Sequence, residues 1–121
     1  MKIKLKELLE CYEGIQGVFD SITKFARVVE LSDNFDEAKR TVTLYEERRK
    51  AITPAGDGEG KVTPLELYEF RKQEAGMLEE EIELKQPVKF TVKECEVALE
   101  AKRIVGSQYN AMRKYFVAKE K

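Results

Sequence analysis

A predicted helical hairpin is the feature that most constrains how this chain folds. Over residues 35–84, two amphipathic stretches flank a glycine-rich loop, residues 53–64, with the sequence TPAGDGEGKVTP. In both stretches one set of side chains recurs at alternating steps of three and four, which places the set on one face of an α-helix. The first set is Phe35, Ala38, Val42, Tyr45, Arg49 and Ile52, and the second is Tyr68, Arg71, Ala75, Leu78 and Ile82. We therefore expect two helices that fold back on each other across the loop.

Two helix starts carry the signature of a capping box, a threonine followed three residues later by a glutamate. The pairs are Thr63 with Glu66 and Thr91 with Glu94. The first pair opens the second arm of the hairpin, where Pro64 also suits the first helical position. The second pair opens a stretch with an apolar stripe, which predicts one C-terminal helix over residues 91–118 with a weak point at Gly106.

The first part of the chain predicts a short strand followed by helix. Residues 1–5 alternate lysine with apolar side chains, as in a strand with one buried face. A helical period follows, which Gly14 and Gly17 weaken. We expect a bend or a break between Gly14 and Ser21, with Asp20 or Ser21 capping the next helix. Close packing of another segment against the glycines is the alternative. We also expect the next helix to be interrupted at residues 32–34, because Ser, Asp and Asn side chains compete for backbone hydrogen bonds.

Together these elements predict a mainly α fold in one domain spanning residues 1–121. We expect a helical hairpin or bundle of four to five helices with a minor short-stranded β-sheet. The sheet would combine the N-terminal strand with the segment around residues 84–90, where apolar and polar residues alternate beside a proline. Charged residues make up 37% of the chain, a fraction that solvated helices accommodate.

Composition argues against several classes of function. The 22 basic and 23 acidic residues nearly cancel, unlike the basic excess of a dedicated nucleic-acid-binding protein. The chain has no histidine, the commonest general base and metal ligand. No apolar run approaches the roughly 18 residues of a membrane span, and the N-terminus lacks the apolar core of a signal peptide. We expect a soluble intracellular protein in which Cys11 and Cys95 are free, buried thiols.

The glycine-rich loop has a partial likeness to a calcium-binding EF-hand loop. When Gly60 is aligned with the turn glycine of that motif, Asp57 and Glu59 fall on ligand positions. Glu66 then takes the position of the bidentate glutamate, but Ala55 stands where the first ligand should be. We therefore expect a solvated turn, no bound cofactor and no metal, with these three acids as weak, degenerate metal candidates.

A set of basic residues with interleaved aromatic ones is the candidate surface for a partner. The set is Arg48, Arg49, Lys102, Arg103 and Arg113, with Tyr109 and Phe116. Such side chains can contact phosphates or stack on bases. The alternative is an amphipathic helix with a basic face toward solvent and an aromatic face toward the core. We predict no catalytic residue.

Several segments follow one another in a distinctive order. They are residues 21–26 (SITKFA), residues 44–50 (LYEERRK), a Gly/Asp-containing loop, Phe70 with Met77 and Leu78, and residues 80–84 (EEIEL). In this order they resemble a family of small uncharacterised proteins encoded by tailed bacteriophages and prophages. The resemblance implies a phage accessory protein without an assigned activity, and it carries over no functional residue.

From the resemblance and the charge-segregated helices we expect a non-enzymatic protein in the host cytoplasm. It would act by forming a homo-oligomer and by binding a phage or host protein, in virion assembly or in counter-defence. The alternative is a protein that binds and sequesters a small ligand, either a nucleotide signal or a metal. Arg48, Arg49 and the acids of the loop support that alternative.

Overall fold

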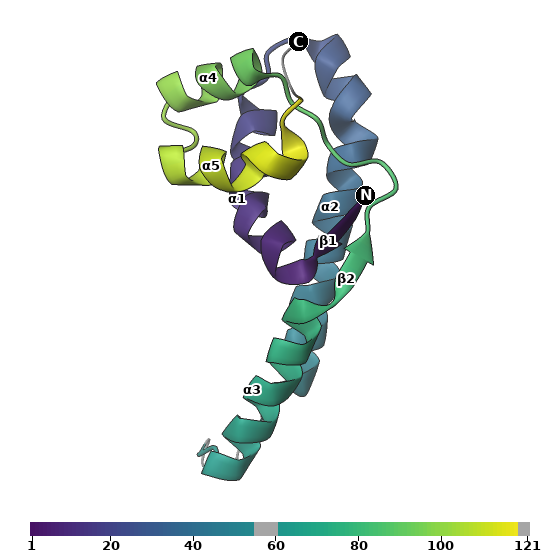
Figure 1. Ribbon diagram of the computed structural model, residues 1–121, viewed down its shortest axis with the longest axis vertical. Helices are drawn as coiled ribbons and strands as arrows, with labels where there is room; N and C mark the ends of the chain where they lie inside the picture. The colour runs from purple at the N-terminus through teal and green to yellow at the C-terminus, as the bar shows by residue number, and fades with distance from the viewer. Residues whose placement is uncertain (55–60, 119–121) are drawn as a thin grey trace.

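The computed structural model describes residues 1–54 and 61–118, and these residues are mainly helical (Figure 1). The elements in chain order are β1 (Lys2–Lys4), α1 (Leu5–Ser21), α2 (Phe25–Ile52), α3 (Pro64–Glu79), β2 (Glu81–Glu83), α4 (Val92–Glu100) and α5 (Gly106–Phe116). The predicted mainly α fold of four to five helices with a minor sheet is therefore confirmed.

Helix α1 lies at the centre of the folded body, where it contacts α2, α4 and α5. Its side chains Leu8, Ile15 and Val18 are completely buried and share one face, because they are spaced by seven and three residues. Phe19 stacks against Phe35 of α2, with ring centroids 4.5 Å apart and planes within 4°. The other elements add the rest of the core: Ile3, Leu31, Ala38, Val42, Leu84, Val88, Phe90, Cys95, Ala98, Ile104, Met112, Phe116 and Val117.

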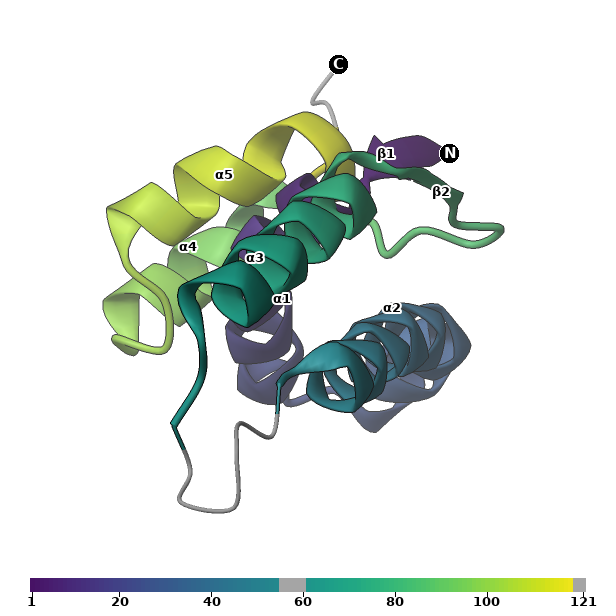
Figure 2. The same ribbon diagram turned by 90° about the horizontal axis from the view of Figure 1, so that it is seen from below.

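The outer half of α2 and most of α3 project from this body as an arm (Figure 1), and the end of α3 toward β2 contacts α1. Figure 2 looks along this arm, with α2 and α3 seen nearly end-on. Buried residues of α2 end at Val42, ten residues before the helix ends, and α3 has no buried residue at all. The first stripe predicted for the hairpin is the inner face of α2, since Phe35, Ala38 and Val42 are buried. Residues 55–60 of the predicted loop lie outside the described residues.

A two-stranded antiparallel sheet ties the start of the chain to the base of the arm. β1 pairs with β2 in a register that sets Ile3 opposite Ile82. The N-terminal amine extends the pairing, because it donates to the carbonyl of Leu84 at 2.9 Å. The segment near residue 90 forms no strand of this sheet; Phe90 instead makes an isolated parallel bridge with Val117.

The predicted single C-terminal helix over residues 91–118 is wrong, because the chain turns between α4 and α5. Lys102 adopts a left-handed backbone with φ of 60°. Its amide bonds the carbonyl of Leu99, and the amide of Arg103 bonds that of Ala98, which together form a Schellman motif that ends α4. The turn lets both helices place an apolar face on α1, which one straight helix could not do.

Of two interruptions predicted from local sequence, one is displaced and one is absent. Helix α1 runs unbroken through Gly14 and Gly17 to Ser21, and the break follows at residues 22–24, with Lys24 rather than Asp20 or Ser21 at the N-cap of α2. Close packing against the two glycines, the alternative, accounts for their place inside the helix. Helix α2 runs unbroken through residues 32–34. The hydroxyl of Ser32 bonds the carbonyl of Val29 within the helix, so it does not compete with the helical hydrogen-bond pattern.

Candidate functional site

The arm carries several large apolar side chains that are exposed to solvent. Four of the nine exposed large apolar residues in the described chain belong to it, Leu44, Leu65, Leu67 and Tyr68, and a fifth, Val62, lies just before α3. Tyr68 and Leu65 are 61% and 69% exposed. Large exposed apolar groups gathered on one element are typical of surfaces that bind another protein.

The inner contact of the arm is made by residues on the opposite side of α3 from Tyr68. Arg49 of α2 forms an ion pair with Glu74, and its guanidinium lies 5.4 Å from the ring centroid of Phe70. The hydrogen bond that Arg49 donates to the carboxylate of Glu74 raises the pKa of Arg49. The second predicted stripe faces away from this contact, because Tyr68, Arg71 and Ala75 are exposed. In the described residues, the Arg49–Glu74 pair and the Phe70 ring join α2 to α3, and the side of α3 that carries Tyr68, Arg71 and Ala75 is exposed.

The base of the arm is acidic and is fixed to the body by lysines. Glu79 accepts from Lys6 at 2.6 Å and from Lys4 at 3.0 Å. Hydrogen bonds, first from Lys6 and then from Lys4, lower the pKa of Glu79. Three further glutamates follow in exposed positions at the same end of α3: Glu80, Glu81 and Glu83.

At the far end of the molecule from the arm, a pocket of about 360 Å³ lies between the α1–α2 junction and the start of α4. Ile22 and Val97 provide its apolar lining. Its charged lining is Lys24, Arg27 and Lys93 together with the acidic Glu94. Within residues 1–54 and 61–118, neither Lys24 nor Lys93 forms an ion pair.

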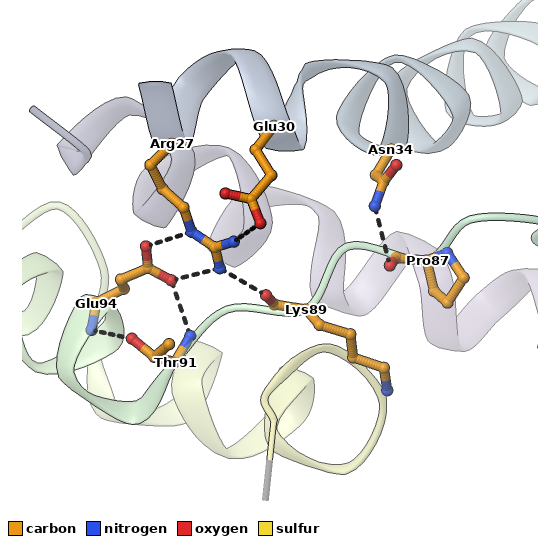
Figure 3. A network of polar contacts seen from close by, with 7 residues as sticks. All are labelled: Arg27, Glu30, Asn34, Pro87, Lys89, Thr91 and Glu94. Carbon is orange, nitrogen blue, oxygen red and sulfur yellow. Dashed lines mark hydrogen bonds and ion pairs between the residues drawn. The ribbon is translucent and has the colours of Figure 1, made fainter. Parts of the chain in front are cut away.

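Arg27 is fixed beside this pocket by a network of charged hydrogen bonds (Figure 3). Its guanidinium donates to both carboxylate oxygens of Glu94, at 2.8 and 3.0 Å, to the carbonyl of Lys89 at 2.9 Å and to Glu30 at 3.1 Å. Burial by itself would raise the pKa of Glu94, but the hydrogen bonds from Arg27 and from the amide of Thr91 outweigh it and lower the pKa. Arg27 therefore links α2 to α4, and its charge is already paired with those of Glu94 and Glu30.

The predicted partner residues do not form one surface. Arg48 is exposed at the outer end of α2, and Arg49 is engaged with Glu74. Lys102 and Arg103 lie in the α4–α5 turn and Arg113 on α5, all exposed and away from the arm (Figure 1).

The two aromatic candidates of that set are core residues in whole or in part. Tyr109 packs against the core while partly exposed. The prediction that Phe116 binds a partner is wrong, because its side chain is completely buried in the core. The alternative, an amphipathic C-terminal segment with its aromatic side toward the core, describes these residues better.

Of the three metal candidates, only Glu66 lies in the described residues, and it serves as a cap. Its carboxylate accepts from the hydroxyl of Thr63 at 3.0 Å, and its amide donates to the same hydroxyl at 3.1 Å. Asp57 and Glu59 lie outside the described residues. Among residues 1–54 and 61–118, no group of three or more Cys, Asp or Glu is placed to hold a metal ion.

Both cysteines are buried, free thiols, as expected. Burial raises the pKa of Cys11 to about 12 and that of Cys95 to about 11. The Cys11 thiol also donates to the carbonyl of Ala111 at 3.2 Å. At neutral pH both are protonated and shielded, so they are packing groups rather than nucleophiles.

Sequence reasoning missed the Arg27–Glu94 pair and the two lysines of the pocket. Arg27 and Glu94 are 67 residues apart, and nothing in the pattern around either residue points to the other. The stripe of α3, by contrast, is predicted by its helical period, but the period does not indicate that Tyr68, Arg71 and Ala75 are exposed.

No protein-family model matches the chain, and no curated protein or solved structure does either. In the part of the chain that the structure describes, none of the helices combines the length and the apolar character needed to cross a membrane.

Proposed function

We propose that this chain is a non-enzymatic accessory protein of a tailed phage or prophage. It acts in the host cytoplasm by self-association and by binding a phage or host protein, in virion assembly or in counter-defence. The arm built from α2 and α3 is the binding element.

One observation carries this proposal: none of the 16 residues of α3 is fully buried, and only its end toward β2 is bonded to the body, through Glu79. An isolated helix of that length is marginal in water, because its stability in proteins comes mostly from packing of one face. A second element that covers α3 supplies this packing. The order of segments that resembles small phage proteins supports the biological setting.

Capture from extracts of phage-infected host cells tests the proposal. Immobilised wild-type protein is compared with a Leu44→Glu/Leu65→Glu variant, which places two charges on the arm. Val105→Glu serves as the matched control, because Val105 is 58% exposed in the connection before α5, away from the arm. We expect a specific protein to be retained by the wild type and the control and lost with the arm variant. Equal retention by all three would contradict a binding role for the arm.

The pocket beside Arg27 favours a second candidate function, the binding of a small anionic ligand such as a nucleotide signal. Its volume of about 360 Å³ lies within the range of small-molecule sites, and it joins apolar lining to two lysines without ion pairs in the described chain. Calorimetric titration with nucleotides, on the wild type and on Lys24→Ala/Lys93→Ala, tests it. A parallel titration with calcium tests the metal version of this candidate. If neither titration shows heat of binding, the candidate is wrong.

A further inference from the structure

We infer that the outer part of α3, residues 64–75, is a hinged flap that opens away from α2 by bending at Gly76. The ion pair of Arg49 with Glu74 is the latch that holds the flap closed. This conformational device goes beyond the proposed binding function, because it is a property of the chain on its own.

The base of α3 is the fixed end of the flap. Glu79 accepts hydrogen bonds from Lys4 and Lys6. The carbonyl of Glu80 accepts from the amide of Leu5 at 2.9 Å, and the chain then enters β2, which pairs with β1. Any movement of α3 relative to the body therefore starts at a residue before Glu79.

Gly76 lies about one helical turn before this fixed end. Relative to alanine, a glycine in a helix interior lowers the equilibrium for helix formation about fivefold. Close packing accounts for Gly14 and Gly17, but among the described residues no atom lies within 4 Å of the β-carbon position of Gly76. Packing therefore does not explain this glycine, and its backbone freedom lets the helix bend at this point.

The contact that keeps the flap on α2 is narrow and lies at the surface. Arg49 pairs with Glu74, and its guanidinium lies 5.4 Å from the ring centroid of Phe70. The side chains of Arg49 and Glu74 are 50% and 24% exposed. An ion pair this close to water contributes little to stability. Because α3 has no fully buried residue, the closed and open flaps are close in free energy.

Backbone packing does not hold the two helices of the arm together. In the described chain α3 packs against α1 at its base, and Figure 2 shows α2 and α3 apart when the arm is seen nearly end-on. The connection between the two helices, residues 53–63, can span up to about 36 Å when it is extended. The covalent connection therefore permits the flap to move.

Salt concentration is the variable that controls the latch. Dissolved ions screen exposed charges, since the Debye length falls from about 10 Å at 0.1 M salt to about 3 Å at 1 M. We therefore expect the open population to rise with ionic strength. The ring of Phe70, which is half-buried in the closed flap, then faces water, so the arm presents a different surface in each state.

Electron paramagnetic resonance between two spin labels tests the flap. The labels are placed on Leu44→Cys in α2 and on Leu65→Cys at the outer end of α3, two exposed positions, while the buried native thiols stay unlabelled. Leu65 lies about 16 Å from Gly76 along the helix, so a bend of about 20° moves this label by roughly 6 Å. We expect a short distance and a longer one, with the share of the longer one rising with salt.

Two substitutions separate the latch from the hinge. Glu74→Gln should raise the ratio of open to closed flap about two- to fivefold and make this ratio insensitive to salt, because the charge of the latch is gone. Gly76→Ala should lower the ratio about fivefold, because it stiffens the helix. Glu69→Gln is the matched control, since Glu69 is exposed on α3 and forms no ion pair within residues 1–54 and 61–118.

Each part of the inference can fail by itself. A single distance of constant width at every salt concentration, in both the wild type and Glu74→Gln, would overturn the flap. An equal effect of Glu69→Gln would overturn the latch, because any charge on α3 would then act alike. An unchanged ratio in Gly76→Ala would overturn the hinge. Capture of a protein by the arm is a separate measurement, so the proposed function does not stand or fall with these results.

Discussion

Gly17 lies so close to Ile104 that a β-carbon on this glycine would stand 2.5 Å from Cγ2 of the isoleucine. The same β-carbon would stand 2.7 Å from the carbonyl oxygen of Arg103. The α4–α5 turn therefore contacts α1 at Gly17. The turn can approach the helix this closely because glycine has no side chain.

The first prediction follows from this contact. Gly17→Ala should destabilise the protein by about 1–3 kcal/mol, because backbone atoms must move to admit the methyl group. This loss outweighs the gain of up to about 1 kcal/mol in helix propensity. Gly76→Ala is the matched control, since nothing lies within 4 Å of its β-carbon position. Urea unfolding measures both, and an unchanged midpoint for Gly17→Ala would show that the turn yields easily.

The second prediction concerns Glu94, whose pKa is lowered in the folded state. A carboxylate with a lowered folded pKa contributes stability that is fully present above its unfolded pKa and is lost as pH falls through the folded value. Its ordinary value is 4.5, so the contribution should disappear as pH falls below about 4.5.

Glu94→Gln tests this dependence, because glutamine can still accept the capping hydrogen bond but carries no charge. We expect the variant to be less stable at pH 7 by about 1 kcal/mol, a value reduced by solvent screening of a partly exposed pair. At pH 3 the difference should shrink. The measurement is the free energy of unfolding of both proteins at pH 7 and pH 3. A difference between them that is constant with pH would show that the charge of Glu94 beside Arg27 does not contribute to stability.

The third prediction separates the arm from the body. Thr91 and Thr63 make the same capping box, the first at α4 in the body and the second at α3 in the arm. Thr91→Ala should lower the global free energy of unfolding by about 1 kcal/mol. Thr63→Ala should instead speed amide hydrogen exchange in α3 alone, because α3 has no fully buried side chain and can open locally. Equal global losses would mean that the arm unfolds together with the body.

The fourth prediction concerns thiol reactivity. Cys11 and Cys95, with pKa values raised to about 12 and about 11, should resist an alkylating reagent at pH 8 until the protein unfolds. The exposed cysteine of Ala75→Cys provides an internal standard that should react at once. Mass spectrometry over time counts the labelled sites. Rapid labelling of either native cysteine in the folded protein would show that the body opens readily around α1.

Local patterns in the sequence predicted the elements whose causes are local. Both capping boxes form as expected, since a threonine and a glutamate three residues apart need only their own helix turn. The buried stripe of α2 also follows from spacing alone, as Phe35 and Val42 show. The β1–β2 pair confirms that the N-terminal alternation marks a strand.

The sequence by itself thus determined the helical class, the capped helix starts and the two amphipathic stripes of the arm. Only the tertiary structure decided that Gly17 is a contact rather than a bend, that Lys102 turns the chain between α4 and α5, and that Arg27 meets Glu94. The physical reason is that each of these depends on a segment far along the chain: Ile104 against Gly17, α1 under both C-terminal helices, and α2 against α4. Spacing fixes which side chains share a face, and packing alone fixes what that face meets.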